Sequence, residues 1–300
     1  MGHNHHQHSH GNSTSNIAVA FFLNFGFTII EFIGGFYTNS LAIMSDALHD
    51  LGDSLSLGLS WYFQKKSNKK ATKTYSYGYK RFSLLGAIVN SIILVIGSVF
   101  IIKEAIPRIL HPENADAKGM MWLAVLGIIV NGAAVLRLKK GTSINERVVS
   151  LHLLEDVLGW VVVLLASIVM QFWDVPVLDP VLSIAIAAFV LYNVYKNIKE
   201  SLRIILQGTP ENISINEVQQ KIVSMKEIES IHDSHLWTMD GEYHVFTAHI
   251  VIQDKELSWE KGDEIKQRVK QMLHDDFHLE HITLELEFAS KECSYKNCGS

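Results

Sequence analysis

The stretch that decides the fold spans Leu41–Phe63 and reads LAIMSDALHDLGDSLSLGLSWYF. It is long enough for one membrane-spanning helix, because a hydrocarbon core of about 30 Å takes roughly 20 residues. Yet this apolar stretch carries Asp46, His49, Asp50 and Asp53. A charged group at membrane depth costs roughly 2.5–3.5 kcal/mol on insertion scales. These side chains must therefore face an interior cavity, pair with one another or bind a ligand.

Five further apolar runs lie on either side of this stretch. With 48% hydrophobic and 19% charged residues among 300, the chain is too apolar for one ordinary soluble domain. We predict an α-helical membrane protein with six transmembrane helices, at about 17–37, 41–63, 82–106, 119–138, 144–172 and 181–206. We expect Pro107 to end the third span and Pro180 to open the last one, in the first turn, where helices tolerate proline.

The positive charges in the loops predict the orientation. The loop between the second and third spans holds seven basic residues: Lys65, Lys66, Lys69, Lys70, Lys73, Lys80 and Arg81. The loop between the first and second spans has none, and neither has the segment 171–179. Because cytoplasmic loops carry the excess of Lys and Arg, we expect both termini to be cytoplasmic. The default location is the inner or plasma membrane, with the lipid bilayer as the protein's surroundings.

The two ends of the chain differ from the apolar part. Residues 1–16 form a His-rich tail, either a native metal-collecting segment or an expression tag, which we expect to be disordered. Residues 17–207 form the membrane domain, and 208–290 form a cytoplasmic domain of order α-β-β-α-β. Its predicted helices are 212–225 and 259–275, and its predicted strands 232–239, 243–253 and 281–288, with a turn at Asp240-Gly241. Residues 291–300 form a C-terminal tail with Cys293 and Cys298.

Two His-x-x-x-Asp pairs carry the candidate chemistry. His49 and Asp53 stand four residues apart and so share one helix face, and His152 and Asp156 repeat the arrangement. Two imidazole nitrogens and two carboxylates make a four-ligand set that suits tetrahedral Zn²⁺. The lack of a thiolate at membrane depth disfavours Cu(I), and the two histidines disfavour Mg²⁺ or Ca²⁺. The other interpretation is a hydrogen-bonded pair that stabilises the bundle, which the duplication disfavours.

Neighbouring polar residues leave the ligand set open. Asp46, Asp50 and Glu155 lie close to the two pairs in sequence, so one carboxylate could replace another. Four more polar residues fall inside predicted spans, namely Asn24, Glu31, Asn90 and Asn131. They could line an ion route or orient ligands, or they could simply form hydrogen bonds between helices.

These motifs together resemble the cation diffusion facilitator family of proton-coupled exporters of zinc and related metals. The resemblance covers the chain from Ile17 to Phe288. It rests on Asn39-Ser40-Leu41-Ala42 leading into Asp46-Ala47-x-His49-x-x-x-Asp53, on Tyr77-Gly78-Tyr79-x-Arg81, on His152-x-x-x-Asp156 and Asp179-Pro180, and on His232-Asp233-x-His235-x-Trp237 and His281-Ile282-Thr283.

The resemblance implies a homodimer with a six-helix membrane unit and a ferredoxin-like, metallochaperone-like cytoplasmic domain. It also implies a transport site made of His49, Asp53, His152 and Asp156. In the cytoplasmic domain, His232, His249 and His281 match positions that bind further zinc near the dimer interface. A full two-metal site is in doubt there, because Trp259 and Thr283 stand where some members have a histidine and an aspartate. His235 or the Cys293–Cys298 pair could substitute, and we interpret His244, His274 and His278 as surface residues.

The expected function is a proton-coupled antiporter, not an enzyme, that exports Zn²⁺ from the cytoplasm. Cd²⁺ and Co²⁺ are further candidate cargo, protons are the counter-ion, and Zn²⁺ is also a candidate regulatory ligand. We expect no nucleic-acid partner. The alternatives are a membrane-embedded zinc-dependent hydrolase, which would need an open position for water, and a membrane-anchored metal sensor, which has no need of ligands at membrane depth. No HExxH stretch occurs in the sequence.

Overall fold

The computed structural model describes residues 10–67, 69–138, 144–254 and 258–288. It divides into two compact units. One contains 1–60 and 88–197, and the other contains 61–87 and 198–300.

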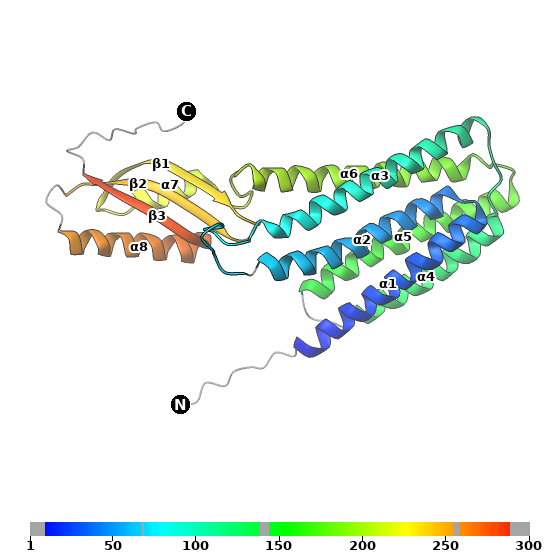
Figure 1. Cartoon of the computed structure of the whole chain (residues 1–300), viewed down its shortest axis with the longest axis horizontal. Coiled ribbons are helices and arrows are strands. Elements are labelled where there is room, and N and C mark those ends of the chain that lie inside the picture. The colour runs from blue at the N-terminus through cyan, green and yellow to red at the C-terminus, as the bar shows by residue number, and fades with distance from the viewer. Residues whose placement is uncertain (1–9, 68, 139–143, 255–257, 289–300) are drawn as a thin grey trace. The chain divides into compact units, whose positions relative to one another are not determined.

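Six long helices make up the apolar part of the chain (Figure 1). They are α1 (His10–Thr38), α2 (Leu41–Ser67), α3 (Phe82–Leu110), α4 (Ala117–Leu138), α5 (Ile144–Phe172) and α6 (Leu178–Ile205). Each predicted span corresponds to one of them. Two expectations need correction. Residues 10–16 belong to α1 and not to a disordered tail, while residues 1–9 lie outside the described residues.

The second correction concerns Pro107, which does not end α3. The helix continues to Leu110, and the His111 N–H donates to the Pro107 carbonyl at 2.8 Å. A proline removes one backbone donor and crowds the preceding turn. Here only one further turn follows it, so the helix ends close to the proline and not at it. Pro180, by contrast, lies in the first turn of α6, as predicted.

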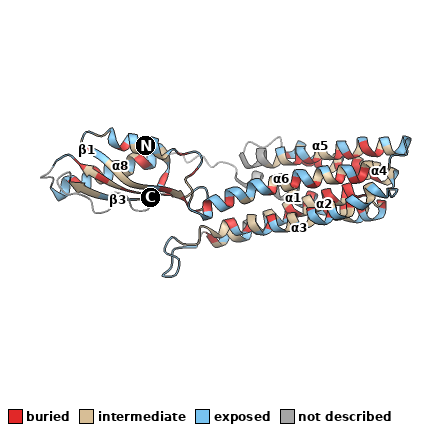
Figure 2. Cartoon of the chain, turned by 90° about the horizontal axis from the view of Figure 1, so that it is seen from above, coloured by how far each residue is buried: buried red, intermediate tan, exposed pale blue. Residues whose placement is uncertain are grey.

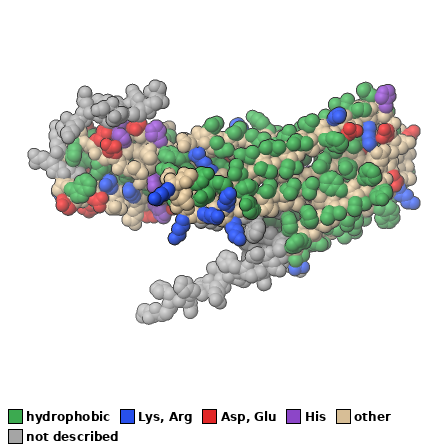
Figure 3. Space-filling model, viewed as in Figure 1, with side chains coloured by type: hydrophobic (Ala, Val, Ile, Leu, Met, Phe, Trp, Pro, Cys, Tyr) green, Lys and Arg blue, Asp and Glu red, His purple; other side chains and the backbone are tan. Residues whose placement is uncertain are grey.

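Five of the helices in the described part of the chain are long and apolar enough to cross a membrane. They are α1 from Phe21, α3, α4, α5 from Val149, and α6. Helix α2, which carries Asp46, Asp50 and Asp53, is not among these five. Large apolar side chains such as Phe36 (78% exposed) and Ile96 (65%) point outward, and Figure 3 shows hydrophobic side chains covering the visible face of the bundle. Such a surface suits a hydrocarbon environment.

A large aromatic side chain packs in the interior of the bundle. Trp160 on α5 is fully buried and meets Phe27 of α1 edge to face, with ring centroids 5.4 Å apart. A Cβ at Gly127 of α4 would lie 2.5 Å from the Trp160 ring, so only glycine fits there. Figure 2 shows that buried residues line the inner sides of these helices. The small residue therefore lets α4 approach α5 closely.

The start of α2 is capped by a carboxylate from another helix. Asp179 of α6, only 2% exposed, accepts hydrogen bonds from the Ser40 hydroxyl at 2.5 Å and from the backbone N–H groups of Leu41 at 2.8 Å and Ala42 at 3.2 Å. The first N–H groups of a helix have no partner within the helix, and a carboxylate there also meets the positive end of the helix dipole. This contact fixes α2, which carries His49 and Asp53, against α6.

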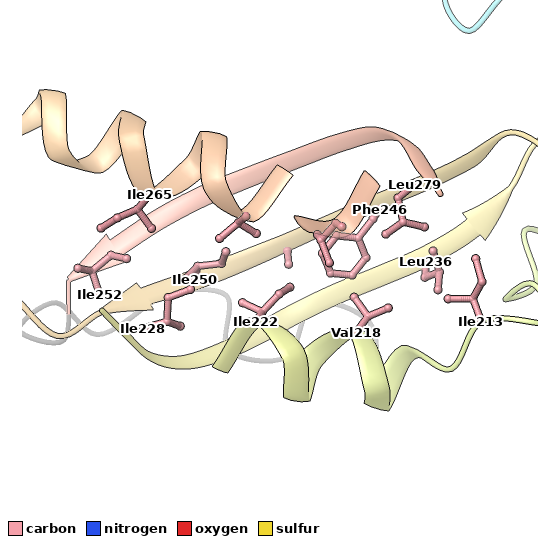
Figure 4. Packing of buried hydrophobic residues seen from close by; sticks show 13 residues of the cluster. Ile213, Val218, Ile222, Ile228, Leu236, Phe246, Ile250, Ile252, Ile265 and Leu279 are labelled. Atoms are coloured by element: carbon pink, nitrogen blue, oxygen red, sulfur yellow. The ribbon is translucent and has the colours of Figure 1, made fainter. Parts of the chain in front are cut away.

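The C-terminal unit contains a small two-layer domain of the predicted order α-β-β-α-β. Its elements are α7 (Ile215–Val223), β1 (Ile228–Thr238), β2 (His244–Ile252), α8 (Trp259–Phe277) and β3 (Leu279–Phe288). The strand order is β1-β2-β3, with β1 antiparallel and β3 parallel to β2. Val218 and Ile222 of α7 and Ile265 of α8 pack onto Phe246 and Ile250 of the central strand (Figure 4). Both helices thus cover one face of the sheet.

Candidate metal centre

The two predicted His-x-x-x-Asp pairs meet inside the helical bundle. On α2, His49 Nε2 lies 3.5 Å from Asp53 Oδ2. On α5, His152 Nε2 lies 2.9 Å from the same Asp53 oxygen and 4.0 Å from Asp156 Oδ2. The two imidazole rings have centroids 6.1 Å apart and are nearly perpendicular. Helices α2 and α5 therefore bring four side chains together from positions about a hundred residues apart in sequence.

Two cavities border this cluster. One, of about 280 Å³, is lined by His49, Asp53 and His152 together with polar side chains that include Asn90 of α3 and Asn193 and Asn197 of α6. The other, of about 210 Å³, is lined by His49 and Asp156 and by mostly apolar residues, among them Val162, Leu182, Ala185 and Ile186. Both cavities include His49 and Glu155, so the cluster lies where a polar cavity and an apolar cavity adjoin.

Further carboxylates lie close to the four side chains. One ligand atom each of His49, Asp50 and Asp53 fall within 4.8 Å of one another. Glu31, Asp46 and Asp50 are buried, and neither carboxylate oxygen of Glu31 or Asp50 has a hydrogen-bond partner among the described residues. Exchange of one carboxylate for another among the ligands is therefore compatible with the geometry. Of the other predicted polar residues, Asn24 and Asn131 are also buried, and Asn90 lines the polar cavity.

A second His–carboxylate cluster lies in the cytoplasmic domain. His232 of β1 pairs directly with His249 of β2 across the ladder, and their rings are 5.2 Å apart. Glu287 of β3 joins them: its Oε1 lies 2.8 Å from His249 Nδ1 and its Oε2 3.4 Å from His232 Nε2. One ligand atom of each of the three residues falls within 4.8 Å of the others. The three strands thus hold three candidate metal ligands side by side.

Other charged groups surround this second cluster. His249 Nε2 lies 3.6 Å from both Asp233 Oδ2 and Glu285 Oε2. The predicted candidate His235 is exposed and lies 3.0 Å from Asp233 Oδ1, so Asp233 connects it to the cluster. Asp233 has a positive φ of 45° within an irregularity of β1. The irregularity brings its carboxylate toward His249.

Comparison with known proteins identifies the family. Residues 17–206 match the family described as "Cation efflux transmembrane domain", and residues 210–289 match "Cation efflux protein, cytoplasmic domain". The chain belongs to the cation efflux, or cation diffusion facilitator, family. As a member of this family it is a transporter and not an enzyme. Its architecture, a helical membrane domain followed by a small cytoplasmic α/β domain, fits that assignment.

Relatives match this cation efflux chain over nearly its whole length. A "Cadmium, cobalt and zinc/H(+)-K(+) antiporter" of Bacillus velezensis is 35% identical over 97% of this chain and 93% of its own. A "Zinc transporter ZitB" of Pectobacterium atrosepticum is 31% identical over 100% of this chain and 92% of its own. Among solved structures, the "Metal-bound C-terminal domain of the CzcD transporter from Cuprividus metallidurans" is 31% identical and covers 25% of this chain and 99% of its own, with a TM-score of 0.23.

The remaining predicted histidines of this efflux protein have varied surroundings. His281 pairs with Val245 in the sheet and stacks edge to face on Tyr77, with ring centroids 5.3 Å apart, so the structure places it apart from the His232–His249 cluster. The prediction that His244 is a surface residue is wrong. It is 5% exposed, and burial lowers the pKa of its imidazole. His274 and His278 are exposed, as predicted, while Cys293 and Cys298 lie outside the described residues.

The carboxylates of the second cluster were not among the residues predicted from the sequence. Glu285 and Glu287 alternate with apolar residues along β3, so they lie on the sheet face that the helices leave uncovered. On the neighbouring strand, His249 falls on the same face. This two-residue period is a signal that would have found the ligands once the strand had been assigned.

Proposed function

We propose that this chain is a proton-coupled antiporter that exports Zn²⁺ from the cytoplasm through a site made of His49, Asp53, His152 and Asp156. The observation that carries the proposal is the shared oxygen of Asp53, which lies within 3.5 Å of imidazole nitrogens from two different helices. Two nitrogens and two carboxylates are a suitable donor set for tetrahedral Zn²⁺. The zinc, cadmium and cobalt transport printed in the relatives' names supports Zn²⁺ as cargo, with Cd²⁺ and Co²⁺ as further cargo.

The exchange follows from the chemistry of the ligands. Imidazole binds a metal only when neutral, so loading Zn²⁺ releases protons and loading protons releases Zn²⁺. In our proposal His49 or His152 carries the exchanged proton, while Asp53 and Asp156 hold the metal. An inward proton gradient then drives the metal outward.

The two cavities support alternating access. The polar cavity includes Lys196 and Asn197 toward the C-terminal end of α6, from which the chain continues into the cytoplasmic domain. The apolar cavity includes Leu182 near the opposite end of the same helix. The asparagine side chains of the first cavity can accommodate a hydrated cation, whereas the second cavity adds Val, Leu and Ile side chains to the carboxylates of Asp46 and Asp156. We therefore propose that metal from the cytoplasm reaches the four ligands through the polar cavity.

The proposal extends to the architecture. Helix α2 also crosses the membrane, which brings the number of spans to six. Its carboxylates are tolerated because they face the cavities and bind cargo. Both termini are cytoplasmic, the membrane is the inner or plasma membrane of a bacterium, and the cytoplasmic domain is ferredoxin-like. Two copies form the working unit. The His232–His249–Glu287 cluster binds a further Zn²⁺ as a regulatory ligand, with His235 recruited through Asp233.

Radioactive zinc flux into inverted vesicles tests the proposal. Vesicles containing the full chain and an acidic lumen should accumulate ⁶⁵Zn²⁺, and a protonophore should abolish the accumulation. Unlabelled Cd²⁺ and Co²⁺ should compete, and Mn²⁺ should compete poorly because it prefers oxygen ligands. Equal ⁶⁵Zn²⁺ uptake with and without the pH gradient would contradict the antiport mechanism. Zinc-dependent cleavage of a peptide or ester in the absence of flux would favour a hydrolase, and zinc binding without either activity would favour a sensor.

A further inference from the structure

The segment that joins the end of α2 to α3 is rich in positive charge and has no acidic residue. From Ser54 to Lys103 the sequence has no Asp or Glu, and within that range the seven basic residues of the segment 65–81 are concentrated. Figure 3 shows Lys and Arg side chains gathered on the face where Figure 1 places this cyan segment. These cations would repel a metal ion, so they are not candidate metal ligands.

The segment is folded and not merely a tether. The backbone N–H of Thr72 donates to the carbonyl of Tyr75 at 3.0 Å, and the N–H of Tyr75 donates back to the Thr72 hydroxyl at 3.1 Å. Gly78 closes the next turn with a positive φ of 77°, and its N–H donates to the Tyr75 carbonyl at 2.9 Å. A glycine adopts this conformation without strain. The lysines in this segment are therefore presented on a defined loop.

An aromatic cluster holds the loop together. The rings of Tyr75 and Tyr79 are 4.8 Å apart, and Tyr79 lies 5.3 Å from Phe82, the first residue of α3. Lys66 covers the Phe82 ring at 4.6 Å. Lys80 lies 5.2 Å from the Tyr243 ring and 4.0 Å from Asp240. Two of the cations thus have partners within the protein.

Three other lysines point away from the protein. Lys69, Lys70 and Lys73 are exposed, and none of them forms an ion pair within the described part of the chain. Tyr75 and Tyr77, 45% and 41% exposed, follow these three lysines in the sequence. Exposed lysines on a short loop between two long helices, followed by tyrosines, are a composition that binds a membrane surface, because the ammonium groups can contact lipid phosphates.

We propose that Lys69, Lys70 and Lys73, displayed on the folded α2–α3 loop, bind the headgroups of anionic phospholipids. The loop ends one residue before α3, which is long and apolar enough to span the bilayer, so chain connectivity holds the three ammonium groups near the membrane surface. Charge complementarity selects the partner, because the loop has no acidic residue that would compete with a lipid phosphate. The attraction acts within the Debye length, about 8 Å at physiological salt. Lipid bound here would hold the cytoplasmic ends of α2 and α3 at the surface of the cytoplasmic leaflet.

Spin-labelled lipids provide the test. The full-length protein is reconstituted in phosphatidylcholine bilayers that contain spin-labelled phosphatidylglycerol or phosphatidylcholine, and the fraction of motionally restricted label gives the relative association of the two lipids. The wild type should prefer phosphatidylglycerol. Replacing all three lysines by glutamine should lower that preference at least about fivefold, and 0.5 M NaCl should lower it similarly in the wild type. The triple Lys→Arg variant should keep it.

The control removes the same charge from elsewhere in the same unit. Lys226→Gln, Lys261→Gln and Lys270→Gln, combined in one variant, change lysines of the cytoplasmic domain that lie on or beside helices α7 and α8 and should leave the lipid preference intact. Unchanged preference in the loop variant would overturn the proposal, and so would a shift of its oligomeric state alone, which would assign the lysines to a second copy of the chain. If the glutamine variant does not insert, the wild-type salt titration decides: a preference for phosphatidylglycerol that resists salt would also overturn it.

Discussion

The two His–carboxylate clusters of this transporter use similar ligands on different supports. In the membrane domain, His49 and Asp53 come from α2 and His152 and Asp156 from α5, two helices whose backbones are each hydrogen-bonded within themselves. In the cytoplasmic domain, His232, His249 and Glu287 come from three strands joined by a continuous hydrogen-bond ladder. If α2 and α5 shift, the side chains of the first cluster move apart while each helix stays intact. The strands of the second cluster can move apart only if the hydrogen bonds of the sheet break.

This difference matches two different tasks. A transport site must release its ion on the far side, so its ligands need two arrangements. Helices α2 and α5 can slide without loss of backbone hydrogen bonds, and cavities adjoin the cluster on two sides. A regulatory site needs only one arrangement that is stabilised when metal binds. We therefore expect changes in the bundle to affect flux and changes in the sheet to affect metal retention.

The largest expected effect comes from removing a transport ligand. His152→Ala deletes the imidazole that lies 2.9 Å from Asp53, leaving three of the four proposed ligands. Since even loss of a residue that only supports a metal ligand costs about 10–100-fold, loss of the ligand itself should lower zinc-driven proton flux by at least about 100-fold. Flux is measured in vesicles with a pH-sensitive dye.

A histidine from the surface provides the matched control. His274 of α8 is exposed, lies 3.3 Å from Asp275 and contacts no residue of either cluster among the ion pairs of the described residues. His274→Ala should transport as the wild type does. If His152→Ala retained full zinc-driven proton flux, the assignment of this histidine to the exchange would fail and the two clusters would no longer differ in role.

A smaller effect is expected from the cap that positions α2. Asp179 Oδ1 accepts from the Ser40 hydroxyl and the Ala42 N–H, and Oδ2 accepts from the Leu41 N–H, so Asp179→Asn replaces one of these two acceptors by an amide NH₂ that donates. Loss of a helix cap costs about 0.5–2 kcal/mol, so the thermal midpoint of the purified protein should fall, and flux should fall less than in His152→Ala. Asp174→Asn, the same chemical change at an exposed residue before α6, should leave both unchanged. An unaltered midpoint in Asp179→Asn would show that the cap does not stabilise α2.

The helices and the four residues of the proposed transport site could be predicted from the sequence, because their signals are local. A polar residue inside an apolar run is visible in one window of sequence, and four-residue spacing places His49 over Asp53. It could not show that one oxygen of Asp53 is close to both His49 and His152, because that depends on the packing of α2 against α5. Nor did it explain Asp179, whose partner Ser40 lies 139 residues away.

The cytoplasmic cluster was harder to predict because strand register decides it. Three histidines were chosen by resemblance. In the sheet, His249 of β2 lies opposite His232 of β1, but His281 of β3 lies opposite Val245, four residues before His249 on β2. Glu287 enters because β3 runs parallel to β2, an arrangement that the sequence of each strand does not contain. His244 was misjudged for a similar reason: its position at the start of the central strand buries it.

Replacing a histidine of the sheet cluster should have the smallest effect on flux but a clear effect on zinc binding. His249→Ala removes the imidazole that contacts Glu287 at 2.8 Å and faces Asp233 and Glu285 at 3.6 Å. The variant should retain one zinc fewer per chain after dialysis, measured by atomic absorption. At saturating zinc its flux should stay within about twofold of the wild type, since the two clusters share no ligand. At low zinc its flux should respond less to added metal, because the regulatory ligand no longer binds.

The double variant with His152→Ala separates the two roles: it should lose flux to the same extent as His152→Ala alone and lose one further zinc. Equal zinc content in His249→Ala and the wild type would instead mean that the sheet cluster is a network of ion pairs between imidazoles and carboxylates, and that the likeness between the two clusters is one of composition only.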